Sequence, residues 1–390
     1  MNTTQLLAAA ERLTGLDDWG GAEYFANEFR ALLDAMVYSL DHESALTEQG
    51  RRGAELRLAT ALEARLRFIE DRKRWPELRR EDIVKPMFIT GLPRSGSTFL
   101  HTLMAQDPGN RVPLTWEMIL PSPPPARTDR AGDPRIARVE QLLKAMGLQT
   151  PEIVALHPFG AELPEEDHLM TEIMLLGDNL PALWRMPSFN RQRAALDAAI
   201  RFRTHRMVLQ NLQARFRAER VLLKNPGHIF QLEALLAEYP DAQIVLTHRD
   251  PAKVIPSVAA LLVMMRRNSS HDVAPAKKIA EGNLRAFADG LLKAIQFRQR
   301  PGIEERFCDV HFRELVTDPI GTVERIYAHF GMGLTDEARR AMRAWLADPA
   351  SRTPKGRHAL AEYGLDEVAI DRAFGEYLDH YHVARERARE

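Results

Sequence analysis

The sequence predicts an α/β protein, with a parallel β-sheet flanked by helices and a helical amino-terminal extension. Three observations lead to this fold class. Short apolar runs recur along the chain, turns containing glycine or proline follow most of them, and a helical pattern follows the turns. Strands that alternate with helices indicate a mainly parallel sheet, because each return of the chain needs a connection long enough for a helix.

Four short apolar segments are predicted as buried strands of this sheet. They are Pro86–Thr90, Val221–Lys224, Gln243–His248 and Phe307–Phe312. Helices are expected after them, at Ser97–Gln106, His228–Tyr239, 252–267 and Ile320–Phe330. Pro108 and Gly109 end the first of these helices, and the proline-rich segment Ile119–Asp133 is a loop.

The first 80 residues have the pattern of helices. In Gly53–Ile69, apolar side chains recur near helical spacing with arginines between them. No segment has the composition of a linker, so we divide the chain into a helical extension, residues 1–80, and one domain, residues 81–390. The apolar stripes of the extension could pack on the sheet domain or against a second subunit, and we favour a homodimer.

The composition limits the classes of protein to which the chain can belong. It has 390 residues, of which 45% are hydrophobic, and this is enough for a sizeable core. Lysine plus arginine number 53 and aspartate plus glutamate number 54, so the net charge is −1. This balance argues against a broad basic surface for nucleic acid or an anionic membrane, while a local basic pocket is compatible with it.

Cysteine usage and hydropathy indicate the compartment in which the protein is expected. Cys308 is the only cysteine, so a disulfide within the chain and a cysteine-based metal site are excluded. Residues 1–12 lack a cationic start followed by an apolar core, so no signal peptide is predicted. The longest apolar run, Val254–Met265, is interrupted by Pro256 and is too short to span a bilayer. We therefore expect a cytoplasmic protein without a membrane span.

The strongest functional motif is Gly91–Thr98 (GLPRSGST), which lies between a predicted strand and a predicted helix. Small residues there let backbone N–H groups approach an anion, and the helix amino terminus attracts negative charge. Arg94 adds a planar cation with several donors. Hydroxyl groups that can add further donors belong to Ser95, Ser97 and Thr98. We interpret this loop as a phosphate or sulfate site, and the alternative is an ordinary turn with a helix cap.

The loop differs from that of nucleoside-triphosphate hydrolases, whose pattern is G-x-x-x-x-G-K-[ST]. Gly91 and Gly96 have the right spacing, but Ser97 occupies the position of the lysine and the cation lies earlier, at Arg94. Without that lysine, an ATP or GTP hydrolase would lose its main contact to the β and γ phosphates. The motif therefore disfavours that class.

The loop resembles the nucleotide loop of bacterial sulfotransferases that use 3′-phosphoadenosine 5′-phosphosulfate (PAPS) as donor and release adenosine 3′,5′-bisphosphate. In that superfamily a P-[KR]-[ST]-G-[ST]-[ST] segment surrounds the 5′-phosphosulfate, and its cation stabilises the sulfuryl group in transfer. The residues that match it position by position are Pro93, Arg94, Ser95, Gly96, Ser97 and Thr98. The resemblance therefore implies a P-loop-like sulfotransferase fold and PAPS as co-substrate.

A second segment, Ile244–Ser257, extends the resemblance. The family places an arginine after a strand and a serine eight positions later, at the start of a helix, and both bind the 3′-phosphate. Arg249 and Ser257 match these positions. Physically this is another strand–loop–helix anion site. Taken alone, Arg249 and Asp250 could instead simply pair with each other or cap the helix.

Two carboxy-terminal segments carry the resemblance to about residue 375, whereas the first 80 residues have no matching motif. Arg313–Gly331 is similar to the segment that ends the core of these enzymes, and Asp318 with Pro319 is expected to start a helix in it. The basic loop that closes over the donor nucleotide in the family is matched by Lys355, Gly356 and Arg357. A solvated charged loop is the alternative for this last segment.

Sulfuryl transfer is treated as an analogue of phosphoryl transfer, an in-line displacement with charge spreading over peripheral oxygens. The protein must align the reactants, stabilise those oxygens and remove the acceptor proton. We assign the stabilising role to Arg94 and Lys224, because the family has a lysine after the matching strand; a surface lysine at a strand end is the alternative for Lys224.

The reaction does not demand a metal ion, since these cations can stabilise the charge on the oxygens. The acidic segment Glu162–His168 fits no standard metal site and is expected to be a solvated loop.

The first candidate for the general base is Glu117. The resemblance implies a carboxylate some twenty residues after an arginine-type loop, and Glu117 is the only carboxylate between Asp107 and Asp129. Desolvation near the acceptor would make such a carboxylate a stronger base. The alternative is a glutamate without a chemical role.

Three further residues compete for the role of the base. His228 lies close to the position of a catalytic histidine in cytosolic members of the family, although Pro226 takes the matching place. The shift of two residues leaves open that His228 only caps the next helix. The remaining candidates are Glu166 and Asp167, which could enter the cleft from a mobile loop.

The acceptor pocket is expected to come from residues 110–220. This region is rich in flexible and aromatic side chains, among them Trp116, Met118, Met170, Met174, Leu176, Trp184, Met186 and Phe189. Such a lining would suit the hydroxyl of an apolar alcohol, a phenol, a lipid-linked molecule or a sugar. The same side chains are also typical of an ordinary core.

The predicted function is thus that of a PAPS-dependent sulfotransferase, with two alternatives. A nucleotide-dependent kinase would need a lysine in the first loop and a magnesium-binding acidic strand end, and the sequence shows neither clearly. A non-catalytic relative that holds an adenine bisphosphate would keep the anion loops and lack a usable base.

Overall fold

The computed structural model describes residues 1–126, 131–349 and 358–386. The chain divides into two compact units, each built from segments that are distant in the sequence. The first unit comprises Met1–Ile83, Pro113–Arg217 and Met264–Val273; the second comprises Val84–Val112, Ala218–Val263 and Ala274–Glu390. Our division of the chain at residue 80 stays a prediction.

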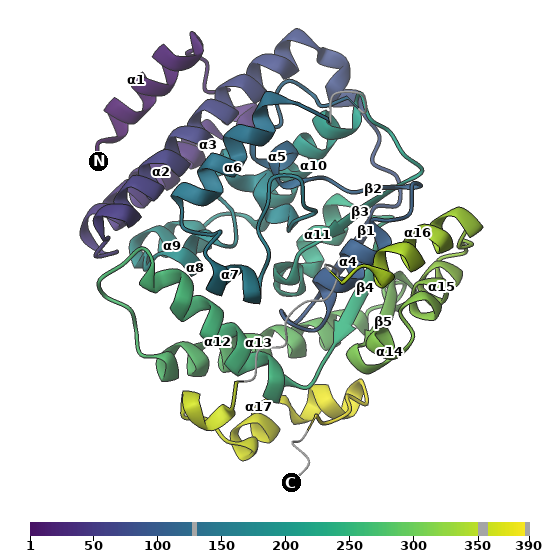
Figure 1. The fold of residues 1–390 in the computed structure, drawn as a ribbon. Helices are drawn as coiled ribbons and strands as arrows, with labels where there is room; N and C mark the ends of the chain where they lie inside the picture. Colours follow the sequence, from purple (N-terminus) through teal and green to yellow (C-terminus); the bar gives the residue numbers. More distant parts are fainter. Residues whose placement is uncertain (127–130, 350–357, 387–390) are drawn as a thin grey trace. The chain divides into compact units, whose positions relative to one another are not determined.

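The second unit contains a five-stranded, fully parallel sheet in the order β2-β3-β1-β4-β5 (Figure 1). Its strands are β1 (Met87–Gly91), β2 (Asn110–Arg111), β3 (Arg220–Lys224), β4 (Gln243–His248) and β5 (Phe307–His311). The four predicted strands and the predicted fold class are confirmed. The remaining strand, β2, escaped prediction because two residues carry no periodic pattern.

Helices follow the strands, as the alternation predicted. In chain order they are α4 (Ser97–Met104), α11 (Leu232–Glu238), α12 (Pro251–Arg267), α13 (Ala276–Arg298), α14 (Phe312–Thr317), α15 (Pro319–His329), α16 (Asp336–Ala347) and α17 (Glu367–His380). Short 3-10 helices are η5 (Pro226–Phe230), η6 (Glu304–Arg306) and η8 (Leu360–Tyr363). The expected start of α15 is confirmed: Asp318 accepts a hydrogen bond from the Gly321 N–H and Pro319 is the first helical residue.

Both faces of the sheet are buried, which explains why its strands are continuous apolar runs. On one face, alternate strand residues pack with α4 and α15 in a core that includes Met87, Ile89, Leu222, Val245, Leu100, Leu103, Val323 and Ile326. Phe88, which follows Met87 in β1, packs instead against Tyr239 and His228. The period of two thus divides β1 between two apolar layers.

The first unit is helical in the part that the structure describes. Its helices are α1 (Thr3–Thr14), α2 (Ala26–His42), α3 (Glu48–Arg74), α5 (Thr115–Ile119), α6 (Pro134–Ala145), α7 (Pro151–Leu156), α8 (Leu180–Leu183), α9 (Pro187–Ala194) and α10 (Ala198–Gln213), with 3-10 helices η1 (Ala22–Tyr24), η2 (Pro76–Arg80) and η4 (Asp167–Met174). The helix expected in Gly53–Ile69 is confirmed as part of α3. Across the described residues, the structure contains no helix long and apolar enough to cross a membrane.

Candidate active site

Two glycines shape the loop that connects β1 to α4. Gly91 has φ 132°, and a Cβ there would lie 2.3 Å from the backbone oxygen of Thr247, so no side chain fits. Gly96 has φ 93°, and a Cβ there would press on the side chains of Leu315 and Phe312 at 3.0 Å. Gly91 is therefore required by close backbone packing and Gly96 by its positive φ and the adjacent side chains, and the loop enters the helix amino terminus where an anion site was predicted.

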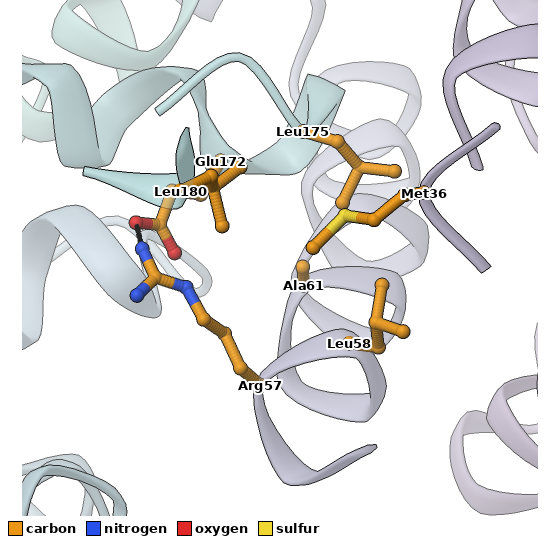
Figure 2. Close-up of a pocket in the computed structure, with 7 residues that line it drawn as sticks. All are labelled: Met36, Arg57, Leu58, Ala61, Glu172, Leu175 and Leu180. Carbon is orange, nitrogen blue, oxygen red and sulfur yellow. Dashed lines mark hydrogen bonds and ion pairs between the residues drawn. The ribbon is translucent and has the colours of Figure 1, made fainter. Parts of the chain in front are cut away.

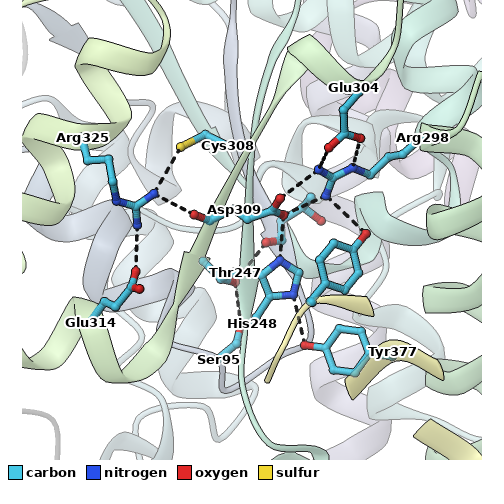
Figure 3. Close-up of polar contacts among 12 residues, drawn as sticks. Ser95, Thr247, His248, Arg298, Glu304, Cys308, Asp309, Glu314, Arg325 and Tyr377 are labelled. Atoms are coloured by element: carbon cyan, nitrogen blue, oxygen red, sulfur yellow. Dashed lines mark hydrogen bonds and ion pairs between the residues drawn. The ribbon is translucent and has the colours of Figure 1, made fainter. Parts of the chain in front are cut away.

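The hydroxyl of Ser95 serves the shape of this loop. It is fully buried and donates a hydrogen bond to the carbonyl oxygen of Leu92. It also lies 2.6 Å from the hydroxyl of Thr247, which donates to the carbonyl of Thr90 (Figure 3). Ser95 therefore ties the loop to β4, and its predicted role as a donor to the anion stays a prediction, as do those of Ser97 and Thr98.

Arg94 connects the first predicted anion loop to the second. Its backbone has φ 65°, a conformation that favours glycine. Its Nε donates to the hydroxyl of Ser257, 3.3 Å away, across 163 positions of sequence. Burial lowers the pKa of the Arg94 guanidinium, and the positive charge of Arg249 lowers it further. Two cations are thus held near each other, an arrangement that a polyanion would stabilise.

Arg249 follows directly after β4 and completes this connection. Its Nη1 donates to the carbonyl oxygen of Arg94 at 2.8 Å, and its guanidinium lies 3.8 Å from the centroid of the Phe312 ring. Its Nε and Nη2 bind the two carboxylate oxygens of Glu386 at 2.9 and 3.1 Å. The alternative pairing with Asp250 is wrong, because Asp250 accepts from the Ala252 N–H at the start of α12 and from Arg385 instead.

A buried polar network supports the backbone of Arg249. The hydroxyl of Tyr377 accepts a hydrogen bond from the Arg249 N–H and lies 3.2 Å from Nδ1 of His248. Nε2 of His248 lies 2.8 Å from Oδ1 of Asp309, and Arg298 donates one hydrogen bond to each carboxylate oxygen of Asp309 (Figure 3). Arg298 and His248 hold the pKa of Asp309 well below its usual value despite its burial, and burial lowers the pKa of His248. The ionised Asp309 can only accept, so neutral His248 donates through Nε2 and accepts from Tyr377 at Nδ1.

Sequence reasoning missed Tyr377 and Glu386, which both contact Arg249. Neither lies in a recognisable motif, and both reach Arg249 from more than 100 positions away in sequence. The apolar pattern of α17, with Ile370, Phe374 and Tyr377 buried, is a signal that could have placed Tyr377 inside.

Lys224 is the last residue of β3 and is fully buried, so the alternative of a surface lysine is wrong. It pairs in register with Ile89 of β1, two residues before Gly91. Lys224 therefore lies at the same edge of the sheet as the first anion loop, because parallel strands end together. Burying an ammonium group is costly, so a buried lysine at this edge of the sheet is a candidate for a functional role, and the predicted role of Lys224 stays a prediction.

His228 lies in η5 with its ring packed edge-on against Phe88, the centroids 5.3 Å apart. The side chain is buried, and the backbone carbonyl accepts from the Gln231 N–H at 2.9 Å. The ring is thus held against the sheet by an aromatic contact. Its role as a base stays a prediction.

Glu117 belongs to the first unit, where it lies in the first turn of α5. Its side chain is fully buried, and Oε2 accepts a hydrogen bond from the Leu114 N–H at 2.8 Å. A carboxylate at this position satisfies an unpaired N–H of the helix start and meets the positive end of the helix dipole. The burial that a useful carboxylate base requires is therefore present, and the catalytic role stays a prediction.

The prediction of a solvated loop for Glu162–His168 is wrong for most of its polar residues. Glu165, Asp167 and His168 are buried, whereas Glu162 is exposed. The physical reason is pairing, which lowers the cost of burying a charge: His157 Nε2 lies 2.8 Å from Glu165, and His205 Nε2 lies 3.6 Å from Asp167. Within the described ranges, no group of three histidine, cysteine or acidic side chains could hold a metal ion.

The side chains expected to line the acceptor pocket are all buried in the first unit: Trp116, Met118, Met170, Met174, Leu176, Trp184, Met186 and Phe189. This burial supports the alternative that they form an ordinary core. Figure 2 shows one cavity of this unit, beside the ion pair between Arg57 and Glu172. It has room for about one water molecule, so it cannot hold an acceptor. Lys355, Gly356 and Arg357 lie outside the described residues.

A model of the sulfotransferase family matches residues 86–336 of the chain. The chain belongs to the sulfotransferase family. The matched range contains both predicted anion loops, Lys224 and Glu117, and the predicted family is thereby confirmed. The enzyme class is likewise that of the sulfotransferases.

Two solved sulfotransferases resemble the chain over nearly its whole length. The sulfotransferase STF1 from Mycobacterium tuberculosis is 30% identical with a TM-score of 0.81, over 96% of this chain and 99% of that one. The sulfotransferase STF9 from Mycobacterium avium is 26% identical with a TM-score of 0.84, over 99% and 98%. The fold of these sulfotransferases therefore extends to the amino-terminal helices, for which the sequence offered no matching motif.

A curated relative is similar over a shorter stretch. The omega-hydroxy-beta-dihydromenaquinone-9 sulfotransferase Stf3 of Mycobacterium bovis is 26% identical over 147 residues. The similarity spans 38% of this chain and 37% of that relative, so it covers little more than a third of either protein.

Proposed function

We propose that this sulfotransferase-family protein transfers a sulfuryl group from PAPS to a hydroxyl acceptor by in-line displacement. The observation that carries the proposal is the junction of the two anion loops at Arg94, whose side chain binds Ser257 and whose carbonyl binds Arg249. PAPS has a 5′-phosphosulfate and a 3′-phosphate, so a pair of joined cationic loops suits both ends of one ligand.

Each loop has a distinct role in this proposal. Pro93–Thr98 and the amino terminus of α4 bind the 5′-phosphosulfate, while Arg249 and Ser257 bind the 3′-phosphate. Arg94 and Lys224 stabilise the negative charge that spreads over the oxygens during transfer. Lys355, Gly356 and Arg357 complete the donor site. The donor supplies the sulfuryl group and the phosphate that leaves, giving adenosine 3′,5′-bisphosphate, and the cations make a metal unnecessary.

The acceptor proton must be removed as the hydroxyl attacks, and we propose Glu117 as the base. Two observations support this choice: the Glu117 side chain is fully buried, and Glu117 is the only carboxylate between Asp107 and Asp129, in the interval after the arginine-type loop. His228 is the second candidate, although the contact of its ring with Phe88 restricts its movement. Glu166 and Asp167 are the remaining ones.

The acceptor class is proposed from the relative with a named substrate. Stf3 is named for an omega-hydroxy-menaquinone, which supports an apolar alcohol or a lipid hydroxyl as the first class to screen, before phenols and sugars. We further propose a cytoplasmic homodimer that acts without nucleic acid.

The test is a thermal-shift titration with adenosine 3′,5′-bisphosphate beside ADP and ATP–magnesium. A ligand that binds only the folded state raises the melting temperature according to its affinity and concentration. A shift with the bisphosphate, and none with ATP–magnesium, supports the donor assignment. A shift with ATP–magnesium and none with the bisphosphate would replace the proposal with a kinase.

A further inference from the structure

We propose that Glu386 is an internal anion that competes with the nucleotide's 3′-phosphate for Arg249, and so sets the affinity of the donor site. The inference rests on the proposed function, because it takes the Arg249 site to be that of the 3′-phosphate. It adds an affinity-determining residue from the carboxy-terminal segment, outside the motifs that define the two anion loops.

The geometry of the ion pair is that of a bound anion. Oε1 of Glu386 accepts from Nε of Arg249 at 2.9 Å, and Oε2 accepts from Nη2 at 3.1 Å. This two-point contact occupies the edge of the guanidinium that binds carboxylates and phosphates in a fork. The third donor, Nη1, is directed to the carbonyl of Arg94, and the Phe312 ring covers a face of the guanidinium. The edge taken by Glu386 is therefore the one best suited to a phosphate.

The backbone of the carboxy-terminal segment is anchored where it delivers this side chain. The Glu386 N–H donates to Oδ2 of Asp250 at 2.7 Å, and Asp250 is buried at the start of α12. Arg385 donates to Oδ1 of Asp250 at 3.2 Å and pairs with Asp371 of α17, while Arg313 donates to the Arg385 carbonyl. Because these contacts do not involve the Glu386 carboxylate, they can persist when the carboxylate leaves Arg249.

Two anions cannot use the same edge of one guanidinium, so binding of the 3′-phosphate requires the carboxylate to leave. The apparent dissociation constant then equals the intrinsic one divided by the fraction of molecules in which Arg249 is vacant. The pair is partly exposed, with side-chain exposures of 22% for Arg249 and 20% for Glu386, and such pairs are weak to moderate. A phosphate with its larger charge can displace the carboxylate, and we expect Glu386 to weaken the binding of 3′-phosphorylated nucleotides by about three- to tenfold.

The experiment compares Glu386→Gln with the wild type by isothermal titration calorimetry, using adenosine 3′,5′-bisphosphate and AMP as ligands. Glutamine keeps the size and the backbone N–H but removes the charge. Glu376→Gln is the matched control, since Glu376 is an exposed glutamate on α17 and the change in net charge is the same. The Glu386→Gln change is also made in an Arg249→Ala background, where no guanidinium remains to compete for.

The proposal predicts that Glu386→Gln tightens the bisphosphate by about three- to tenfold, leaves AMP unchanged, and has no effect in the Arg249→Ala background. Unchanged or weaker bisphosphate binding in Glu386→Gln, with a wild type that still binds it, would overturn this inference and leave the proposed function intact. An equal gain for AMP or in Glu376→Gln would also overturn it, because the effect would be general electrostatics. If neither wild type nor variant binds the bisphosphate, the proposed function fails and the inference fails with it.

Discussion

Arg94 and Ser257 are 163 positions apart in the sequence, yet Nε of Arg94 donates a hydrogen bond to the Ser257 hydroxyl at 3.3 Å. The contact joins the loop after β1 to helix α12. Each residue belongs to a separate strand–loop–helix segment of the second unit. The family resemblance assigned each of them to a different end of the same nucleotide. A change at Ser257 is therefore expected to affect both loops.

Ser257→Ala tests this connection through binding. The variant removes a hydroxyl donor from the proposed 3′-phosphate site and a partner from Arg94, so affinity for adenosine 3′,5′-bisphosphate should fall about tenfold. The affinity for AMP, which lacks the 3′-phosphate, should fall less. Calorimetry with both ligands measures the difference. Equal affinities in variant and wild type would show that Ser257 does not bind the nucleotide.

Glu117→Gln tests the assignment of the base. The amide cannot accept the acceptor proton, so kcat should fall by about two to four orders of magnitude, while bisphosphate affinity stays close to that of the wild type. His228→Gln should retain most of the activity. Both are measured as sulfuryl transfer from PAPS to an acceptor found by screening. If both variants transfer at the wild-type rate, neither residue is the base.

Tyr377→Phe tests the network behind Arg249. The Tyr377 hydroxyl is buried and forms hydrogen bonds with both the Arg249 N–H and His248. Leaving these two groups unpaired should lower the free energy of unfolding by about 1–3 kcal/mol. Bisphosphate affinity should fall as well, because Arg249 loses its backbone support. Tyr363→Phe is the control, since the Tyr363 hydroxyl makes a long contact of 3.4 Å with His358. Similar denaturation midpoints and affinities for the two variants would contradict the assigned role.

Asp71→Asn tests a pH dependence of stability in the first unit. Burial raises the pKa of Asp71 from 3.8 to about 6, although the nearby Ser122 hydroxyl and the charge of Arg135 oppose this rise. The folded state therefore holds its proton to a higher pH than the unfolded chain, and stability decreases as the pH rises from about 4 through 6. Asparagine mimics the protonated form, so the variant should melt at a higher temperature than the wild type at pH 7.5.

The gain should vanish near pH 4, where folded Asp71 is itself protonated. Asp34→Asn is the control, because Asp34 is exposed and pairs with Arg30 at the surface. Melting curves of the three proteins at pH 4 and pH 7.5 give the comparison. An equal gain at both pH values would mean that the effect has another cause than the charge on Asp71.

Local patterns predicted the sheet and the first candidate anion loop, and the family resemblance added the second, because each of these features lies within one continuous segment. The strand β1, Gly91 and Gly96 form one continuous segment, and Arg249 with Ser257 forms another. The junction between the segments, from Arg94 to Ser257, depended on the sheet order and became visible only in the structure.

Burial and long-range partners were harder to predict. Lys224 ends a strand, and the sequence alone was compatible with a location at the surface. In the structure its side chain is fully buried. Asp167 lies in an acidic run that is typical of solvated loops, but its contact with His205 allows it to be buried. Glu386 carries no motif, and only the fold places its carboxylate on Arg249.

The central claim is that Arg249 binds a 3′-phosphate, and Arg249→Ala tests it most directly. Calorimetry would compare the affinities of wild type and variant for adenosine 3′,5′-bisphosphate and for AMP. We predict a loss of at least about tenfold for the bisphosphate, since a charge-assisted contact is removed, and little change for AMP. Equal losses for both nucleotides would contradict the claim, because Arg249 would then act on the shared part of the ligand or on the fold.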